Sequence, residues 1–362
     1  MKIKELRLRF IEFYRSKGYT LYPPSSLISQ EFPYTYLASL DMKYITNCLT
    51  KAERIVIVQD CFRHFDVQNV GDGIHLSLFE MGTALNKGEK LKEEIIELCH
   101  SFLHEVCKIP LNKLFFTVFG GGVIFDKKLS TDCKSIEILN KLGYSSRVIK
   151  CRGATNFFGG TSSHNIYAGP RIEIYYDTSQ KCASCSGVGH AGCKRFVEIA
   201  TIPFLSYIKQ VNGEHIELLP YGPSINASAI GFERLAMISM QASDIYNIDF
   251  FNDCKKLIQI KGKLKNNDKV IAKIIDHVRA ACFLIADGAK PSNKGRGNVF
   301  RKLIRAIYRN YHTLGFCNSD LLRKLIQKTI IEFSPFYGIL DSKEDEIFAI
   351  LEREKARYGE NI

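Results

Sequence analysis

The spacing of apolar residues changes once along the chain, and this change restricts the fold more than any other feature. Before about residue 242, short runs rich in β-branched and aromatic residues recur between a few helical segments, at 55–58, 114–119, 172–176 and 196–199. From Ser243 onward the apolar residues follow helical spacing and few strand signals remain. The pattern predicts an α+β domain over residues 1–242 and an all-helical domain over residues 243–362.

Composition and charge narrow the class of protein. The 362 residues are 46% hydrophobic, and 50 Lys and Arg against 38 Asp and Glu give a net charge of +12. Such a chain folds into globular units, and its charge favours an anionic partner such as nucleic acid or nucleotide phosphate. The sequence shows no signal peptide and no membrane span, and its 12 cysteines are scattered. We therefore expect a cytoplasmic protein with reduced cysteines and no membrane contact.

Two arginines stand where a chain can meet phosphate groups. Arg63 ends a strand-like run, and a polar loop leads from it to a return strand that contains residues 79–81. Arg234 opens a helix after Gly231, and a helix N-terminus also favours anions. The guanidinium group is permanently charged and pairs with phosphate oxygens. A lone arginine is usually a solvated surface charge, but two in this setting favour a phosphate site.

These two segments resemble motifs 2 and 3 of class II aminoacyl-tRNA synthetases. The resemblance is to the alanyl-tRNA synthetase family in particular, and it extends over essentially the whole chain. It is carried by FYRSKG at 13–18, NVG at 69–71, HLSLFEM at 75–81, GPRIEIYYD at 169–177, and a long segment from DHVR to PSNKGRG at 276–297.

The resemblance implies a class II catalytic domain with an antiparallel sheet of six strands flanked by helices. It also implies that the protein uses ATP and Mg²⁺ to form alanyl-adenylate and then alanyl-tRNA. It implies that Arg63 holds the α-phosphate and Arg234 the γ-phosphate. Phe79 and Met81 would lie near the adenine, with ordinary core packing as their alternative. Glu80 would accept a hydrogen bond from the adenine or its sugar. The other implied ATP-binding residues are His75 and Glu233.

The amino-acid pocket departs from the family pattern. The family's WN dipeptide is Ala200-Thr201, the tryptophan of its NFW motif is Phe158, and the aspartate expected to hold the substrate ammonium is Asn226. An amide accepts a hydrogen bond but forms no ion pair. Besides an alanyl-tRNA synthetase, two alternatives therefore stay open. One is a degenerate paralogue that binds tRNA or nucleotide without aminoacylation, and the other is a ligase that activates another small amino acid.

A glycine-rich insertion over residues 178–195 carries four soft metal ligands, Cys182, Cys185, His190 and Cys193. Zinc binds Cys and His side chains tetrahedrally, and four such ligands would leave no position for water. The spacing predicts a structural zinc site. The alternative is a reduced, flexible cysteine-rich insertion.

Lysine and arginine residues are concentrated at the end of the 276–297 segment and just after it, in the predicted helical domain. A dense basic face can follow a phosphate backbone, which gives affinity but no sequence readout. By resemblance, Asn293 would read the acceptor stem of tRNA. The alternatives are a solvated helix face for the cations and buried helix packing for His277 and Arg279. The proposed tRNA-binding cations are Lys294, Arg296, Arg301, Lys302 and Arg305.

The family's editing domain and C-terminal oligomerising domain have no counterpart in these 362 residues. The distal part of the tRNA-recognition domain also has none. We therefore expect a monomer that does not edit in cis.

Overall fold

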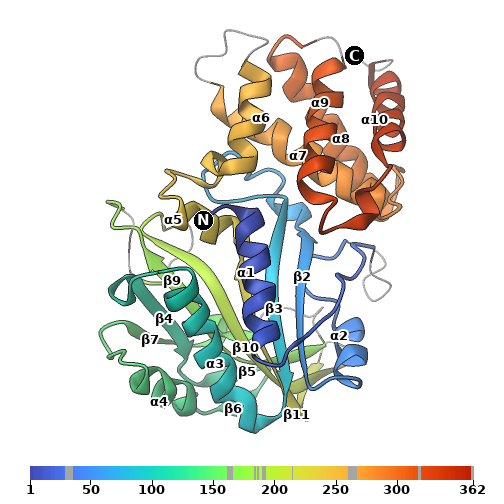
Figure 1. Cartoon of the computed structure of the whole chain (residues 1–362). Coiled ribbons are helices and arrows are strands. Elements are labelled where there is room, and N and C mark those ends of the chain that lie inside the picture. Colours follow the sequence, from blue (N-terminus) through green and yellow to red (C-terminus); the bar gives the residue numbers. More distant parts are fainter. Residues whose placement is uncertain are drawn as a thin grey trace.

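The molecule has a sheet part and a helical part stacked on one end of it (Figure 1). The computed structural model describes residues 1–28, 36–160, 166–182, 185, 187–189, 193–213, 215–259, 267–316 and 319–359. We call the strands with α1 to α5 the sheet part, and α6 to α10 the helical part. The predicted fold class is confirmed. The division at residue 242 stays a prediction, since one hydrophobic cluster runs through both parts.

The main sheet is antiparallel at its centre. The strands β2, β3, β11, β10, β9 and β4 lie side by side in this order, each antiparallel to the next, and β1 and β7 add parallel edges. The four predicted strand runs lie in β2, β4, β9 and β10. The bounds are β1 Thr20–Leu21, β2 Arg54–Phe62, β3 Leu78–Lys87, β4 Leu114–Phe119, β7 Ile149–Arg152, β8 Phe157–Phe158, β9 Tyr167–Asp177, β10 Phe196–Asn212 and β11 His215–Gly231, with a hairpin of β5 Gly122–Ile124 and β6 Lys127–Leu129.

Helices cover one face of the sheet. Helix α1 (Ile3–Ser16) buries Leu6, Phe10 and Tyr14, which recur at helical spacing along one side. The Phe10 ring packs edge-on against Phe102 and Phe232, with centroid distances of 5.2 and 5.4 Å. These contacts bring α1, α3 (Lys92–Ser101) with the π-turn that follows it, and α5 (Phe232–Ser239) onto a shared core.

The second face of the sheet, opposite α1, has a smaller cluster. Along β2, Val56 and Val58 belong to the α1 core, whereas Ile55 and Ile57 pack in a separate cluster with α2 (Met42–Leu49). This separation follows from the alternation of side chains along a strand. Helix α4 (Cys133–Lys141) lies beyond β4 in the sheet part.

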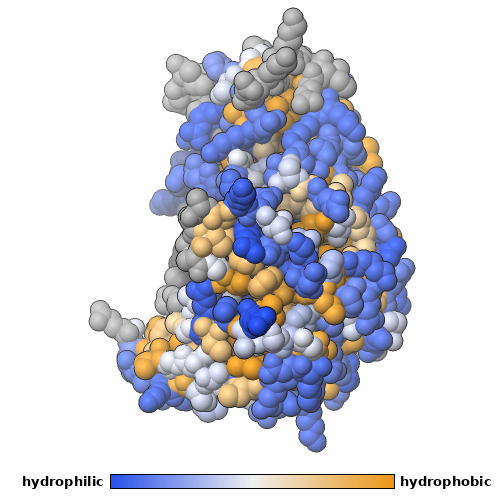
Figure 2. Space-filling model, turned by 90° about the vertical axis from the view of Figure 1, so that its left-hand side faces the viewer, coloured by the Kyte–Doolittle hydropathy of each residue, from blue (hydrophilic) through white to orange (hydrophobic). Residues whose placement is uncertain are grey.

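Helix α7 (Asp268–Ala286) is the centre of the helical part. It packs against α6 (Asp249–Gln259), α8 (Gly295–Thr313), α9 (Asp320–Phe333) and α10 (Glu344–Gly359). Every residue from Ile274 to Ile285 is buried, so α7 has no solvent-facing side in this stretch. None of the described helices combines the length and apolarity that crossing a bilayer requires. On the side of the molecule in Figure 2, hydrophilic residues cover most of the helical part, and hydrophobic patches are small and interrupted.

The backbones of β9 and β10 approach closely at Gly169. A Cβ atom there would lie 1.8 Å from the carbonyl oxygen of Phe204. We therefore expect Gly169→Ala to lower the free energy of unfolding by about 1–3 kcal/mol, measured by urea denaturation. The control is Gly338→Ala, where the nearest atom would lie 3.9 Å away. Equal unfolding midpoints for the two variants would contradict the prediction.

Candidate functional site

Arg63 stands at the base of the loop between β2 and β3. Its backbone N–H donates to the carbonyl of Ser77 at 2.8 Å, which closes the loop. Its side chain is 39% exposed, lies 3.4 Å from the Asp66 carboxylate, and stacks over the Phe65 ring at 4.6 Å. This guanidinium therefore remains within reach of an additional anion.

Arg234 lies in the first turn of α5 and reaches the second face of the sheet. Its Nη1 donates to the Glu198 carbonyl at 3.1 Å and lies 3.6 Å from the Glu198 carboxylate. Burial raises the pKa of Glu198, whereas Arg234, Arg171 and Arg63 act to lower it. Arg234 thus contacts Glu198 directly, and Arg63 acts on the same carboxylate without a direct contact.

Next to this region, Glu173 anchors a set of polar side chains on the second face. Its carboxylate accepts hydrogen bonds from Thr117 Oγ1 and Tyr175 Oη, both at 2.9 Å, and lies 2.6 Å from Arg171. Asn156 donates to Thr117 at 2.8 Å. Sequence reasoning missed Glu173 and Glu198 as site candidates. The available signal was a charged residue inside an otherwise apolar strand.

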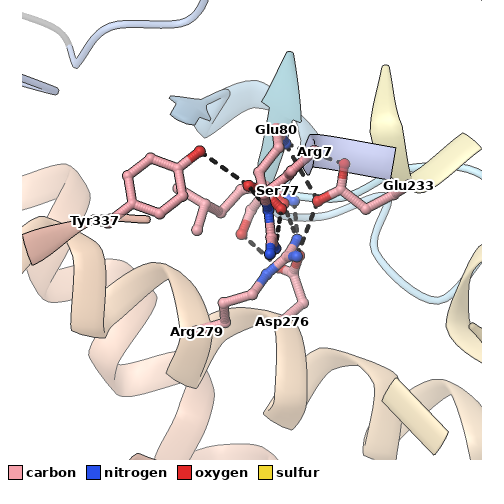
Figure 3. A network of polar contacts seen from close by, with 8 residues as sticks. Arg7, Ser77, Glu80, Glu233, Asp276, Arg279 and Tyr337 are labelled. Atoms are coloured by element: carbon pink, nitrogen blue, oxygen red, sulfur yellow. Dashed lines mark hydrogen bonds and ion pairs between the residues drawn. The ribbon is translucent and has the colours of Figure 1, made fainter. Parts of the chain in front are cut away.

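Glu80 lies on the opposite side of β3 from Phe79 and Met81. Its carboxylate is 2% exposed and accepts hydrogen bonds from Arg7 at 2.5 and 2.6 Å and from the Tyr337 hydroxyl at 2.9 Å (Figure 3). Burial raises the pKa of Tyr337, so its hydroxyl stays protonated and donates. This differs from the expected contact between Glu80 and the nucleotide, because neighbouring residues on a strand face opposite sides.

Glu233 also points into the buried side. Its carboxylate accepts the Glu80 backbone N–H at 3.0 Å and a hydrogen bond from Arg279 at 2.9 Å (Figure 3). The structure therefore separates Glu80 and Glu233 from Arg63 and Arg234. Phe79 and Met81 are half-buried and lie on the opposite side of β3 from Glu80, and Phe79 also packs against the α1 core cluster. Their contact with the nucleotide stays a prediction. His75 lies in the loop, with Nδ1 2.5 Å from the Asp72 carboxylate.

The predicted amino-acid pocket is divided by the sheet. The register sets Thr201 beside Ala229 and Glu173, which places it on the second face, and half-buried Phe158 packs against the apolar cluster of that face. Asn226 faces the other side and donates to the Asn86 side chain at 2.9 Å and to the Gly88 carbonyl at 2.8 Å. Asn226 therefore does not join Thr201 and Phe158, because a shift of one residue along a strand reverses the face.

Three of the four predicted zinc ligands are close together. Cys193 Sγ lies 3.4 Å from Cys185 Sγ and 3.9 Å from Cys182 Sγ. His190 lies outside the described residues. Among the residues that are described, no group of three or more His, Cys, Asp and Glu side chains is arranged to hold a metal ion by itself.

The predicted tRNA-binding residues gather at the start of α8 and along it, but they differ in exposure. Asn293, Lys294, Lys302 and Arg305 are exposed and Arg296 is half-buried. The Arg301 side chain is only 12% exposed, lies 3.0 Å from the Glu354 carboxylate on α10, and donates to Asn293. Arg301 therefore joins α8 to α10, and this partner lies too far away in sequence to be predicted from helical spacing.

The family model and the curated relatives place the chain in the same family. The model of class II (A) tRNA synthetases matches residues 5–362. An alanine–tRNA ligase of Elusimicrobium minutum is 30% identical over 372 residues, which cover 100% of this chain and 42% of the relative. The alanine–tRNA ligase of Borrelia garinii subsp. bavariensis is 31% identical over 378 residues, which cover 100% of this chain and 62% of the relative. The chain thus spans less than two thirds of these relatives. The S. aureus histidyl-tRNA synthetase structure matches with a TM-score of 0.41 at 11% identity, over 86% of this chain and 83% of that one.

Proposed function

Since this chain belongs to the family of class II (A) tRNA synthetases, we propose that it activates alanine with ATP and transfers it to the acceptor end of tRNA. The observation that carries the proposal is the placement of Arg234 against Glu198 on the face that also presents Phe79, Met81 and Thr201, together with a partly exposed Arg63 at the base of the loop that leads into β3.

In the first step, a carboxylate oxygen of alanine attacks the α-phosphorus of ATP. The new phosphorus–oxygen bond forms as the bond to the bridging oxygen breaks, and pyrophosphate leaves. Arg63 contacts the α-phosphate and Arg234 the γ-phosphate, and both stabilise negative charge on oxygen as it develops. In the second step a terminal ribose hydroxyl of tRNA attacks the acyl carbon, and AMP leaves.

Magnesium fits one acidic side chain of the same face, that of Glu198. Mg²⁺ takes one or two carboxylates together with substrate phosphates. Glu198, whose side chain is 37% exposed, supplies such a carboxylate beside Arg234, whereas Glu173 is buried and already engaged. When bound there, the ion would neutralise charge on the phosphates.

The alternative of a ligase for another small amino acid is not favoured by the relatives, which are alanine–tRNA ligases, but the contact to the substrate ammonium differs from the family pattern. Asn226 is engaged on the other side of the sheet, and Ala227 packs in the cluster of the second face. Neither side chain offers the substrate ammonium a carboxylate. Specificity then depends on the surroundings of Thr201 and Phe158.

We propose that Cys182, Cys185 and Cys193, together with His190, hold a structural zinc ion. Zinc–sulfur bonds of about 2.3 Å in a tetrahedron set sulfur atoms about 3.8 Å apart. The distances of 3.4 and 3.9 Å between the sulfur atoms support this. Gly189 of this insertion lies against the second face, because a Cβ there would lie 3.1 Å from the Thr117 methyl group.

The first prediction of this proposal concerns ATP. Arg63→Ala and Arg234→Ala should each lower alanine-dependent exchange of pyrophosphate into ATP by roughly 100-fold, because each removes charge stabilisation from a phosphate. Arg353→Ala, an exposed arginine on α10, is the control. Near-normal exchange in both site variants would refute the assignment. Run over all amino acids, the same assay decides between alanine and another small amino acid.

The second prediction concerns zinc. Protein purified without chelators should contain about one equivalent of zinc, and Cys185→Ser should release it because a closed site needs all four ligands. Cys133→Ser, at an exposed cysteine outside the insertion, should retain it. Elemental mass spectrometry measures the zinc content per protein chain in each sample. Wild-type protein without zinc would favour the flexible insertion.

The third prediction separates affinity from readout in tRNA binding. Lys302→Ala should weaken binding to all tRNAs alike and reduce the salt dependence, because a phosphate contact is lost. Asn293→Ala should erode the preference for a G·U pair over a G·C pair at the acceptor end by about 1–3 kcal/mol. Filter binding over a salt series measures both. A wild-type protein that binds acceptor stems without preference would contradict the role of Asn293.

A further inference from the structure

Arg279 of α7 holds the backbone of β3 on both sides of Phe79. It binds the residue before Phe79 directly, and it binds the residue after Phe79 through the carboxylate of Glu233. It is 0% exposed, and its Nη2 donates to the carbonyl of Leu78. Its Nη1 donates to Glu233 Oε1 at 2.9 Å, and Glu233 Oε2 accepts the backbone N–H of Glu80 at 3.0 Å (Figure 3). The peptide groups that flank Phe79 are therefore both held by the Arg279–Glu233 pair.

The same pair fixes the orientation of Arg234. Consecutive residues of a helix point about 100° apart. With Glu233 held inward by Arg279, Arg234 is directed to Glu198 on the second face. One buried ion pair thus sets the position of Phe79 on β3 relative to Arg234 on α5.

A second contact from α7 reaches Arg63. Asp276, one turn before Arg279, accepts the backbone N–H of Ser77 at 3.0 Å and also binds the Ser77 hydroxyl. The Ser77 carbonyl accepts the backbone N–H of Arg63 at 2.8 Å. Helix α7 therefore holds the backbone next to Phe79 and the base of the loop at Arg63.

The helical part in turn fixes the Arg279 guanidinium. Its central carbon lies 5.7, 5.3 and 5.8 Å from the ring centroids of Phe250, Phe251 and Phe333. The planar fork of arginine can donate to Leu78 and Glu233 together, whereas a lysine presents a single nitrogen.

We propose that Arg279 is a positioning residue for the nucleotide site and that, through Glu233, it sets Phe79 and Arg234 for ATP. The inference rests on the proposed function. It adds that the packing of the helical part against the sheet is a condition for ATP binding, although no atom of Arg279 touches the nucleotide.

The test removes both charges of the pair at once. In Arg279→Met/Glu233→Gln no buried charge is left unpaired, so the protein should fold, but the bond to Leu78 is lost. We expect the Kd for ATP and the KM for ATP in pyrophosphate exchange to rise about 10-fold or more, as for other small misplacements of binding groups, with the KM for the amino acid unchanged. The control is Lys92→Met/Asp132→Asn, which removes a mostly buried pair 2.6 Å apart between α3 and the start of α4.

An ATP Kd and KM within twofold of wild type in the folded double variant would overturn the inference. If that variant does not fold, Arg279→Lys takes its place, and a folded Lys variant with the wild-type Kd and KM overturns it equally. A wild type that binds ATP but exchanges no pyrophosphate refutes the proposed activity, while the Kd comparison still tests Arg279. A rise in the control as large as in the double variant would also refute the positioning role.

Discussion

Buried ion pairs restrict how α1 and the helical part can lie against the sheet. Arg7 with Glu80 and Arg279 with Glu233 are each close to fully buried, and each pair joins elements far apart in sequence. Burying an ion pair gives little net stability, but leaving one partner alone inside the protein costs about 3–5 kcal/mol. Arrangements of α1, β3, α5 and α7 that separate these partners are therefore strongly disfavoured. The apolar cluster supplies the driving force for packing, and the ion pairs select one arrangement.

The two faces of the sheet consequently have different roles, one in packing and the other in presenting polar side chains. The side under α1 is mostly apolar, and its buried ion pairs are accompanied by other buried polar groups. The Asn226 amide nitrogen donates to Asn86 and to the Gly88 carbonyl, while the Asn226 Oδ1 and the Asp60 Oδ2 have no hydrogen-bond partner among the described residues. The second face carries Glu198, Arg234 and Arg171, whose side chains are only partly covered, next to the buried Glu173. Polar groups with incomplete coverage are the ones that can still bind a charged substrate.

Local patterns were sufficient to predict the runs that lie in β2, β4, β9 and β10 and the helical spacing after residue 243, but they missed the central strand β11. The assignment of Arg63 and Arg234 to phosphate groups stays a prediction. Patterns did not determine which way a strand residue faces. Glu80 and Asn226 were each assigned to the substrate side, and each lies on the other side, because the face depends on register and not on residue type. Arg301 was taken as a free cation because its partner Glu354 is 53 residues away. Glu173 and Glu198 were missed because a single charge in a strand has no periodic signal.

The burial of α7 on all sides has a consequence for the tolerance of length changes. One residue inserted ahead of Asp276 would rotate the rest of this helix by about 100° and advance it by about 1.5 Å. Asp276 and Arg279 would then meet apolar side chains, and apolar residues would meet the carboxylate of Glu233. Insertions and deletions should accordingly accumulate in the connections around α7, while the helix itself keeps a fixed number of residues in any sequence that retains this architecture.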